Sequence, residues 1–333
     1  MNDIAQADTV PVSEILDHPV LGERAWSRDE VDTSNWRIEL TDSMVAELIS
    51  VVTQLRSAPL PLLLCRARDF LLVECRTVVQ QVRNKLHHGM GLAIVSGLPM
   101  NVLSKQEAVT IFWLIGQMLS NPVATKWDGT MLYDVIDTEK EIGYGVRAAE
   151  TNAELFFHTD NAFGLSVPDY VGLLCIYPAA RGGISRFCSM YSVHNELLKL
   201  SPKLLRRLYE PVYYDRQEEH CRGASKTLTA PVFHFSRQQL TVRLSFKLIR
   251  RGYALAGQRL DALLVEALEC LEHILRRDEM SIEYRIERGE MQFVNNHWTA
   301  HARSAFEDEV NPKYRRHLVR SWYREQGRPT YDG

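Results

Sequence analysis

The sequence predicts a mainly β fold, either a sandwich or a barrel, with helices packed around the outside of the β core. From about residue 130 onward, short runs of β-branched and aromatic residues are separated by turns that contain Gly, Pro, Asn or charged residues. Two helical segments interrupt this region, and the part of the chain before it is mainly helical. No internal repeat or low-complexity linker divides the chain. The simplest arrangement is therefore one domain with a mainly antiparallel β core.

The helices are predicted from the 3.6-residue spacing of apolar side chains, which places these side chains on one face. One helix begins with Ser104-x-x-Glu107, a capping box in which two side chains satisfy free backbone N–H groups. Another contains Pro202, whose fixed backbone angle suits the first turn of a helix. The last has a basic end, which complements the helix dipole. In chain order, the predicted helices cover about 42–57, about 69–88, 104–119, about 192–209 and about 258–277.

The strands are predicted from short runs of β-forming residues that end at turn residues. The first run ends at Gly97 and Pro99 and lies between two predicted helices, which indicates a buried strand. Residues 1–35 mix Pro, Asp and Ser without periodicity, so we expect a surface arm there and a single domain over 36–333. In chain order, the predicted strands are GLAIVSGLP, MLYDVID, YVGLLCIY, SRFCSM, PVFHFS, LTVRLSF, SIEYRIE, MQFVNN and HLVRSWYR.

Composition and charge exclude several classes of function. The 333 residues carry a formal net charge of -3, and no basic stripe indicates binding to nucleic acid. No apolar run reaches the roughly 20 residues that cross a bilayer, and the first residues are acidic where a secretory signal is basic. We therefore expect a cytoplasmic protein without a membrane partner. The 6 cysteines form no C-x-x-C pair, which argues against a zinc knuckle or a disulfide framework.

The stretch ELFFHTDNAF places His158 and Asp160 two residues apart among apolar neighbours. On an extended strand, residues i and i+2 lie on one face, so an imidazole and a carboxylate can reach the same metal ion. The aromatic neighbours exclude water, which strengthens metal–ligand bonds. Two imidazoles and one carboxylate can hold Fe(II) and leave the opposite side of the ion open. The pair therefore predicts part of a metal site that requires a further ligand.

A second pair of the same type, His194 and Glu196, has a different setting. Val193, Leu197 and Leu200 around it have helical spacing. On a helix, residues i and i+2 point about 200° apart, so these two side chains cannot bind one ion. We therefore predict a structural or surface role for His194.

The further ligand is expected from VNNHWTAHARSAF, which contains His297 and His301. A helix would allow both histidines to bind, because they are four residues apart. The predicted strand MQFVNN leads into this segment, however, and the Asn-Asn pair indicates a turn. A single contributor is favoured, and the spacing alone does not choose between the two.

Three stretches, FFHTDNAF, GGISRF and NNHWTAHARSAFEDEVNPKYRRHLVRSWYR, in this order resemble a known family. It comprises the Fe(II)/2-oxoglutarate-dependent oxygenases of the taurine dioxygenase type, also called clavaminate synthase-like. The resemblance runs from about Gly91 to Tyr323. It implies a double-stranded β-helix, the jelly-roll or cupin-like fold, as a core over about residues 90–325 with helical insertions.

The resemblance implies the metal ligands. His158 and Asp160 match the H-x-D pair of the family. His301 matches the distal histidine of the family segment N-N-x-W-x-x-H-x-R, which makes it the third ligand. His297 stands where the family often has Arg, and its role stays open between a contact to the substrate, a contact behind the ligands and a surface position.

The resemblance also implies how 2-oxoglutarate is bound. Arg316 matches the arginine that pairs with the far carboxylate of this co-substrate, and Ser185 matches a hydroxyl residue that shares the carboxylate. A planar guanidinium can bind a carboxylate through two parallel hydrogen bonds. Arg320 matches a second arginine that lines the pocket. Arg303 and Asp308 are expected to form a structural network near the distal histidine.

The implied reaction uses Fe(II), 2-oxoglutarate and O₂ and releases succinate and CO₂, with hydroxylation of an unactivated C–H bond as the default outcome. Asp160 disfavours a halogenase, because related halogenases lack the carboxylate ligand. Desaturation, epoxidation and cyclisation use the same ligands and stay open. A zinc-dependent hydrolase or isomerase on a cupin-like fold would leave Arg316 and Ser185 unexplained. A non-catalytic cupin-like binding module would make the complete ligand set a coincidence.

The expected substrate is a small polar or anionic molecule, such as an amino-acid derivative or a natural-product intermediate of secondary metabolism. Two long polar segments, about 125–152 and 211–231, flank the ligand segments and are expected to cover the site as mobile lids. Nothing indicates a protein or nucleic-acid substrate, and a homo-oligomer is compatible with the sequence. The residues expected to contact the substrate are Tyr144, Arg147, Asn152, Phe157, Asn161, His297 and Arg320.

Overall fold

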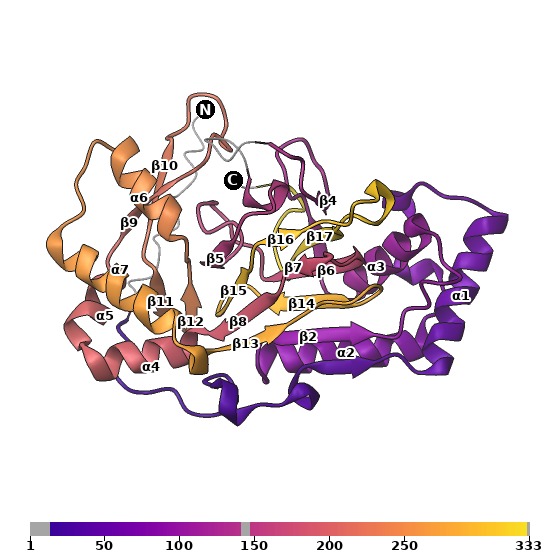
Figure 1. The fold of residues 1–333 in the computed structure, drawn as a ribbon, viewed down its shortest axis with the longest axis horizontal. Helices are drawn as coiled ribbons and strands as arrows, with labels where there is room; N and C mark the ends of the chain where they lie inside the picture. The colour runs from indigo at the N-terminus through magenta and orange to yellow at the C-terminus, as the bar shows by residue number, and fades with distance from the viewer. Residues whose placement is uncertain (1–13, 141–146, 332–333) are drawn as a thin grey trace, which may run out of the picture.

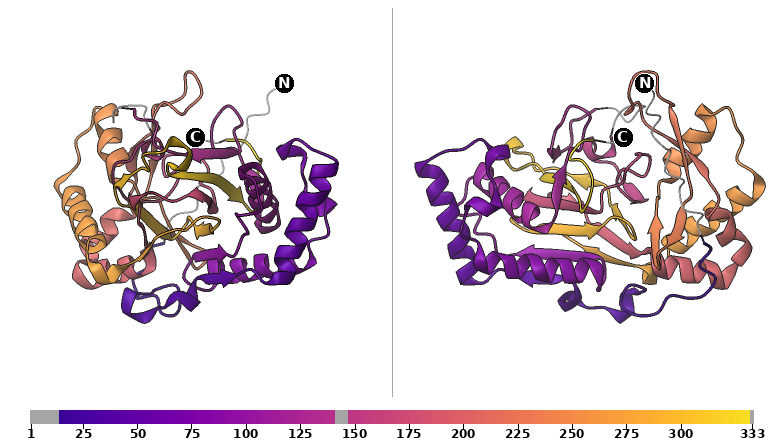
Figure 2. Two further views of the ribbon diagram at one scale, coloured as in Figure 1. Left: turned by 45° about the vertical axis from the view of Figure 1, so that its right-hand side comes forward. Right: turned by 180° about the vertical axis from the view of Figure 1, so that it is seen from behind.

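The computed structural model of the chain describes residues 14–140 and 147–331. Its centre consists of β-sheets, and helices lie at both ends of this β core (Figure 1). Figure 2 shows from two further sides that the helices of the N-terminal part of the chain lie at one end of the core and those of the C-terminal part lie at the other. The predicted mainly β core with surrounding helices is confirmed. Tyr144, an expected substrate contact, lies outside the described residues.

The larger sheet contains seven strands, which are β1 (Arg37–Glu39), β2 (Leu92–Ser96), β3 (Asn121–Val123), β4 (Leu132–Val135), β6 (Tyr170–Tyr177), β14 (Met291–Asn295) and β17 (His317–Arg324). Their order across the sheet is β1-β2-β14-β6-β17-β3, and β4 also pairs with β17. All pairs are antiparallel except that of β1 with β2. The strand β2 is buried along its whole length, because one of its faces packs on helices and the other on the smaller sheet.

The smaller sheet contains four antiparallel strands, which are β5 (Leu155–His158), β8 (Ser185–Ser189), β13 (Ser281–Tyr284) and β15 (Thr299–Arg303). Their order is β13-β8-β15-β5. The two sheets pack against each other, since Leu92 and Ile94 of the larger sheet share a buried cluster with Phe187 and Ile282 of the smaller one. This double-layered antiparallel core is the double-stranded β-helix that the resemblance implied.

Three pairs of short strands lie outside these two sheets. They are β9 (Val212–Asp215) with β10 (Thr227–Ala230), β11 (Phe233–Ser236) with β12 (Gln239–Val242), and β7 (Arg181–Gly182) with β16 (Phe306–Glu307). Single turns of 3-10 helix complete the described chain, at Arg28–Glu30, Thr33–Asn35, Leu62–Leu64, Ala67–Asp69, Ala148–Glu150, Asp278–Met280 and Pro312–Tyr314.

The helices form two groups, one beside each sheet. The first group packs on the larger sheet through a shared buried cluster, and the second packs on the smaller sheet in the same way. The first group is α1 (Asp42–Ser57), α2 (Val73–His87) and α3 (Lys105–Leu119). The second group is α4 (Met190–Leu200), α5 (Pro202–Leu208), α6 (Phe246–Leu255) and α7 (Ala262–Leu275).

Local signals predicted several helix ends correctly. The capping box of Ser104 and Glu107 is present at the start of α3, and α1 covers the predicted residues. The segment predicted as one helix over about 192–209 is two helices, because Ser201 has an extended backbone and caps α5 ahead of Pro202. The predicted strand LTVRLSF was wrong in its second half, since β12 ends at Val242 and α6 begins shortly after it.

The described part of the N-terminal arm runs along the lower edge of the molecule in Figure 1. Trp26 anchors it, because this side chain is 2% exposed and its Nε1 donates a hydrogen bond to the carbonyl of Met90 at 3.0 Å. The division into an arm over 1–35 and one domain over 36–333 stays a prediction. All six cysteines are free, and four of them are buried. No helix in the described ranges is long and apolar enough to cross a membrane.

Candidate active site

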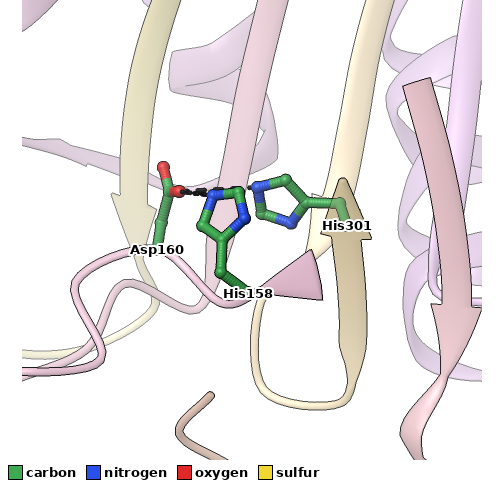
Figure 3. Close-up of side chains that lie close together, drawn as sticks. All are labelled: His158, Asp160 and His301. Carbon is green, nitrogen blue, oxygen red and sulfur yellow. Dashed lines mark ion pairs between the residues drawn. The ribbon is translucent and has the colours of Figure 1, made fainter. Parts of the chain in front are cut away.

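Two strands of the smaller sheet bring two of the predicted ligands together. His158 ends β5 and His301 lies in the middle of β15, where the backbone register places them opposite each other. The centroids of their rings are 4.3 Å apart. Oδ1 of Asp160 lies 3.3 Å from Nε2 of His158 and 3.4 Å from Nε2 of His301 (Figure 3). The three ligand atoms lie within 4.8 Å of one another, so the predicted ligands converge on one point.

A turn, and not a continuing strand, carries the carboxylate to this point. The strand β5 ends at His158, and Asp160 opens a turn in which Asn161 has a left-handed φ of 54°. Asparagine is among the residues that adopt this conformation most readily. Thr159 fixes the start of the turn, because its N–H donates to the carbonyl of Leu244 and its Oγ1 accepts from the N–H of Leu244, each at 3.0 Å. Strand alternation thus predicted the right residues but only part of their geometry.

The carboxylate of Asp160 is buried and strongly held. It is 5% exposed, and its Oδ2 accepts hydrogen bonds from Trp322 Nε1 at 2.7 Å and from Arg320 Nη1 at 3.1 Å. Burial alone would raise the pKa of Asp160, but the charge of Arg320 and the contacts with both histidines hold it well below its usual value. The group is therefore ionised, and its Oδ1 faces the two imidazoles.

The two imidazoles direct their Nε2 atoms at the same point. Nδ1 of His158 lies 3.1 Å from the carbonyl oxygen of Phe156. A carbonyl can only accept, so Nδ1 carries the proton and Nε2 presents its lone pair to the site. Burial, and then the neighbouring His158, lower the pKa of His301. The neutral imidazole that this favours is the form that binds a metal.

This donor set fits iron. Two imidazole nitrogens and one carboxylate oxygen on one side of a point are the ligands of facial Fe(II) sites, in which the remaining positions are open. In residues 14–140 and 147–331, this is the one group of His, Cys, Asp and Glu side chains close enough to hold a metal ion. An aromatic side chain borders it directly, since Trp322 is 3% exposed and contacts the carboxylate of Asp160.

Arg316, the predicted partner of 2-oxoglutarate, is a buried cation without an acidic partner in the described part of the chain. Its guanidinium lies over the ring of Phe306, 4.8 Å from the ring centroid. Burial, and then the charge of Arg303, lower the pKa of Arg316 to about 9. A buried cation is costly unless a ligand pairs with it. The adjacent Arg315 instead pairs with Glu139 at 2.6 Å and its side chain is 42% exposed.

Ser185 and Arg303 lie across from each other in the smaller sheet. Ser185 begins β8, and the register of β8 with β15 pairs it with Arg303. The guanidinium of Arg303 lies 4.8 Å from the centroid of the Phe306 ring that also contacts Arg316. Asp308 accepts a hydrogen bond from the backbone N–H of Arg316 at 2.8 Å. Arg316 and Arg303 thus lie over one aromatic ring, while Ser185 is opposite Arg303 in the sheet and Asp308 holds the backbone of Arg316.

A cavity of about 390 Å³ is lined by two of the predicted metal ligands and by both segments that were expected to cover the site. Arg147 from the first segment donates a hydrogen bond from Nε to Oε1 of Glu219 in the second segment at 2.8 Å. A second N–H of Arg147 and the hydroxyl of Tyr331 donate to the other oxygen of this carboxylate. A partly buried ion pair therefore joins the two segments at the cavity.

Several expected substrate contacts line the cavity, but two others do not. Asn152 is exposed, and its carbonyl accepts a hydrogen bond from the backbone of Phe306 at 3.1 Å. His297 is hydrogen-bonded to Asp169, with 2.5 Å between Nε2 and Oδ1. Neither residue belongs to the cavity lining. The chain at His297 is a turn into a strand and not a helix. The expected contacts that line the cavity are Arg147, Phe157, Asn161 and Arg320.

The sequence reasoning missed Trp322 and the first turn of α6. Trp322 is two residues from Arg320 on β17, and residues i and i+2 share a face of a strand, so this spacing was an available signal. Ser245 to Leu248 line the cavity as the start of α6. Their signal was Ser245, a favoured helix cap whose Oγ accepts from the N–H of Leu248 at 3.5 Å.

The competing pair lies far from this chemistry, as predicted. His194 is on α4, is 0% exposed, and its Nε2 lies 2.8 Å from the hydroxyl of Tyr209. Glu196 on the same helix accepts a hydrogen bond from Arg277 at 2.8 Å. The structural role predicted for His194 is confirmed. His194 and Glu196 contact different residues, so the two side chains do not form a metal-binding pair.

A family profile described as "Taurine catabolism dioxygenase TauD, TfdA family" matches residues 58–322. The chain belongs to this family. It is therefore a 2-oxoglutarate-dependent dioxygenase, an iron enzyme of the oxidoreductase class. The match begins at residue 58, well before Gly91, where the motifs of the sequence first showed the resemblance.

Relatives with similar sequences include proteins named as biosynthetic or hydroxylating enzymes. FR-33289 synthase of Streptomyces rubellomurinus (strain ATCC 31215) is 30% identical over 322 residues, which cover 95% of this chain and 93% of the relative. L-lysine 4-hydroxylase of Flavobacterium sp. (strain CF136) is 27% identical over 203 residues, which cover 58% of this chain and 50% of the relative.

Solved structures share the fold. Asparagine oxygenase in complex with Fe(II), 2S,3S-3-hydroxyasparagine and succinate has a TM-score of 0.69 and 19% identity, over 87% of this chain and 94% of that chain. The non-heme iron oxygenase OrfP in complex with Fe and alpha-ketoglutaric acid has a TM-score of 0.65 and 17% identity, with the same coverage of 87% and 94%. At this identity the likeness supports the jelly-roll core alone.

Replacing His301 by Ala is expected to weaken Fe(II) binding by more than roughly 100-fold. Loss of a residue that only supports a metal ligand already lowers metal affinity by up to about this factor, and His301 is a proposed ligand itself. Its matched control is His194→Ala, which removes a buried histidine from α4 and should lower the melting temperature while leaving Fe(II) affinity unchanged. Anaerobic titration with Fe(II) measures the first effect and thermal unfolding measures the second. If His194→Ala were the variant that lost iron, the separation of the two pairs would be wrong.

The burial of His194 also leads us to expect that the stability of the fold depends on pH. Burial, with a smaller contribution from His18, lowers the pKa of His194 from 6.5 to about 4. The unfolded chain takes up a proton below about pH 6.5 and the folded protein only near 4, so stability decreases as pH falls through this window. His194→Gln should remove up to about 3 kcal/mol of this decrease. Urea unfolding at pH 7 and pH 4.5 measures it; an equal pH dependence in both proteins would contradict the assignment.

Proposed function

We propose that this enzyme holds Fe(II) on His158, Asp160 and His301, binds 2-oxoglutarate through Arg316, and hydroxylates a small polar metabolite. The observation that carries the proposal is the convergence of three metal-binding atoms on one point in the wall of a cavity. The buried guanidinium of Arg316 provides the second part of the site, because Arg303 beside it lies on the strand that carries His301. Family membership supports both assignments.

The carboxylate that Arg316 would bind is the far carboxylate of 2-oxoglutarate. A guanidinium can hold it through two parallel hydrogen bonds, and the free Nη1 of Arg316 is one donor for them. Ser185 is proposed to donate to the same carboxylate from β8. When bound, iron and 2-oxoglutarate activate O₂: 2-oxoglutarate is oxidised to succinate and CO₂, one oxygen atom enters succinate and the other enters the substrate C–H bond.

The chain's own residues orient the ligands and exclude water. Trp322 and Arg320 hold Oδ2 of Asp160, which leaves Oδ1 for the metal. Phe156 and Phe246 form an aromatic wall of the cavity, with ring centroids 5.7 Å apart. Such a wall removes solvent from the site and strengthens the electrostatic contacts within it.

The substrate is proposed to be a small molecule with charged groups, such as an amino-acid derivative. The cavity of about 390 Å³ admits a molecule of this size, and its lining contains charged side chains of both signs besides the metal ligands. Names of similar proteins support the class: one relative is an L-lysine 4-hydroxylase, and asparagine oxygenase was solved with hydroxyasparagine. The roles in secondary metabolism and in the cytoplasm, and a homo-oligomeric state, stay predictions.

The second candidate, a zinc-dependent hydrolase or isomerase, uses the same three ligands. It provides no partner for Arg316, whose buried guanidinium forms no ion pair with a carboxylate in the described ranges. Desaturation, epoxidation and cyclisation would keep the whole site and differ only in how the substrate radical reacts. The geometry of the protein favours none of them over hydroxylation.

Anaerobic addition of Fe(II) and 2-oxoglutarate to the apoprotein tests the proposal directly. The chelate of the two is expected to give a weak visible charge-transfer band, and admission of air with a panel of amino acids and their derivatives should release succinate. Zn(II) in place of Fe(II) serves as the control and should give neither signal. Absence of the band, together with absence of succinate for every compound, would show that the proposed chemistry is wrong.

Arg316→Gln is expected to raise the KM for 2-oxoglutarate by roughly 30-fold or more, since losing one partner of a buried charge pair costs about 2–5 kcal/mol. Arg315→Gln is the matched control: the same change at the adjacent residue removes only a surface ion pair with Glu139. Its KM should stay close to that of the unmodified enzyme. Steady-state succinate release at varied 2-oxoglutarate measures both. A larger effect at Arg315 would reassign the binding arginine.

A further inference from the structure

Asn296 binds the backbone of Asp160 through its side chain. It lies in the turn between β14 and β15 and is 0% exposed. Its Oδ1 accepts a hydrogen bond from the N–H of Asp160 at 2.7 Å, and its Nδ2 donates to the carbonyl of Asp160 at 2.9 Å. Nδ2 also donates to the carbonyl of Pro168 at 3.0 Å, and the backbone N–H of Asn296 donates to Asp169 at 2.9 Å. One residue therefore holds both ends of the loop over 160–169.

Asp160 needs this contact because strand pairing has ended before it. The last residue of β5 is His158, and the turn that follows takes the backbone of Asp160 away from β15. A buried backbone group left without a hydrogen bond destabilises the folded state. A side-chain amide presents an acceptor and a donor side by side, as the backbone of a neighbouring strand does. Asn296 thus supplies the strand partner that Asp160 lacks.

The same contact connects the halves of the metal site. Asn296 lies shortly before β15, the strand that carries His301. The carboxylate of Asp160 is oriented from the larger sheet, but Trp322 and Arg320 contact only its Oδ2. The point from which this side chain extends is fixed by Asn296. The distance from Oδ1 to the two imidazoles therefore depends both on the side-chain contacts from the larger sheet and on the backbone contacts from Asn296.

We propose that Asn296 is a positioning residue of the metal centre, which sets the distance between the carboxylate of Asp160 and the two histidines. This inference rests on the proposed function and adds a residue that is not itself a ligand of the metal or of 2-oxoglutarate. A site held in the binding geometry loses less freedom when the metal binds, so its affinity is higher. Removing the amide should weaken Fe(II) binding more than it weakens the fold.

The neighbouring Asn295 provides a matched control. It is also buried, at 6% exposure, and its Nδ2 donates to the carbonyl of Leu86 at 3.1 Å. Its Oδ1 accepts from the N–H of His297 at 3.0 Å. Asn295 therefore has the same chemistry and the same type of backbone partner, but it ties the turn to α2 and makes no contact with Asp160 among the described residues.

The test compares Asn296→Ala with Asn295→Ala in the full-length protein. Each variant is titrated anaerobically with Fe(II) in the presence of 2-oxoglutarate, and its free energy of unfolding without metal is measured by urea denaturation. Asn296→Ala should bind Fe(II) about 10- to 100-fold more weakly and shift or broaden the charge-transfer band of the chelate. Asn295→Ala should lose comparable stability and keep the affinity and the band of the unmodified protein.

Asn296→Ser keeps the inference testable if Asn296→Ala does not fold. Its hydroxyl can satisfy one backbone group of Asp160, so its Fe(II) affinity should lie between those of the alanine variant and the unmodified protein. Equal Fe(II) affinity in the Asn296 and Asn295 variants would overturn the positioning role and leave the proposed function intact. Failure of the unmodified protein itself to bind Fe(II) with 2-oxoglutarate would instead overturn the proposed function, and the positioning role with it.

Discussion

The buried carboxylate of Asp160 is the group on which the rest of the site depends. A carboxylate with 5% exposure is costly unless charges and hydrogen bonds compensate for its lost hydration. The compensating groups come from separate elements, since Trp322 and Arg320 lie in the larger sheet and His158 and His301 belong to the smaller one. These elements meet only when the two sheets have packed. The metal site and the jelly-roll core are therefore products of the same packing step.

The 2-oxoglutarate region has the opposite imbalance of charge. Arg316 and Arg303 are buried beside one aromatic ring, and neither forms an ion pair with a carboxylate in the described ranges. Burial and mutual repulsion lower the pKa of Arg316, which shows that its charged form is disfavoured without a ligand. Such strain is common where a site is organised for a ligand, and it lowers stability in exchange for affinity. Asp160 thus provides negative charge where Fe(II) is proposed to bind. Arg316 and Arg303 provide positive charge where 2-oxoglutarate, a dicarboxylate, is proposed to bind.

Sequence patterns predicted the features that have local causes. The capping box of α3 is such a feature, because the residues that form it are three apart. The choice between His297 and His301 needed the family resemblance, since spacing alone allowed either. His297 is turned to Asp169, a partner far away in the sequence, and no local pattern could show this contact. The start of α6 was misread because the alternation of apolar and polar residues continues past the end of β12, through Leu244 and Phe246.

The residues that sequence reasoning missed at the site have partners that only the fold brings close. Asn296 was read as part of a turn, which it is, but its contact with Asp160 joins residues 136 positions apart. The pair of Arg147 and Glu219 likewise joins two loops that were each expected to cover the site. The motif therefore identified the metal ligands, and the structure was needed to identify the residues that hold them.

A chain of contacts leads from the metal ligand to the segments that cover the cavity. Trp322 donates to Asp160 and stacks on Tyr331, with ring centroids 6.3 Å apart and an interplanar angle of 16°. Tyr331 in turn donates to Glu219, the partner of Arg147. Arg147 and Glu219 are largely shielded from water, at 16% and 12% side-chain exposure, so separating them leaves two poorly solvated charges. A substrate with its own carboxylate or ammonium group can replace the lost interaction, whereas a neutral substrate cannot.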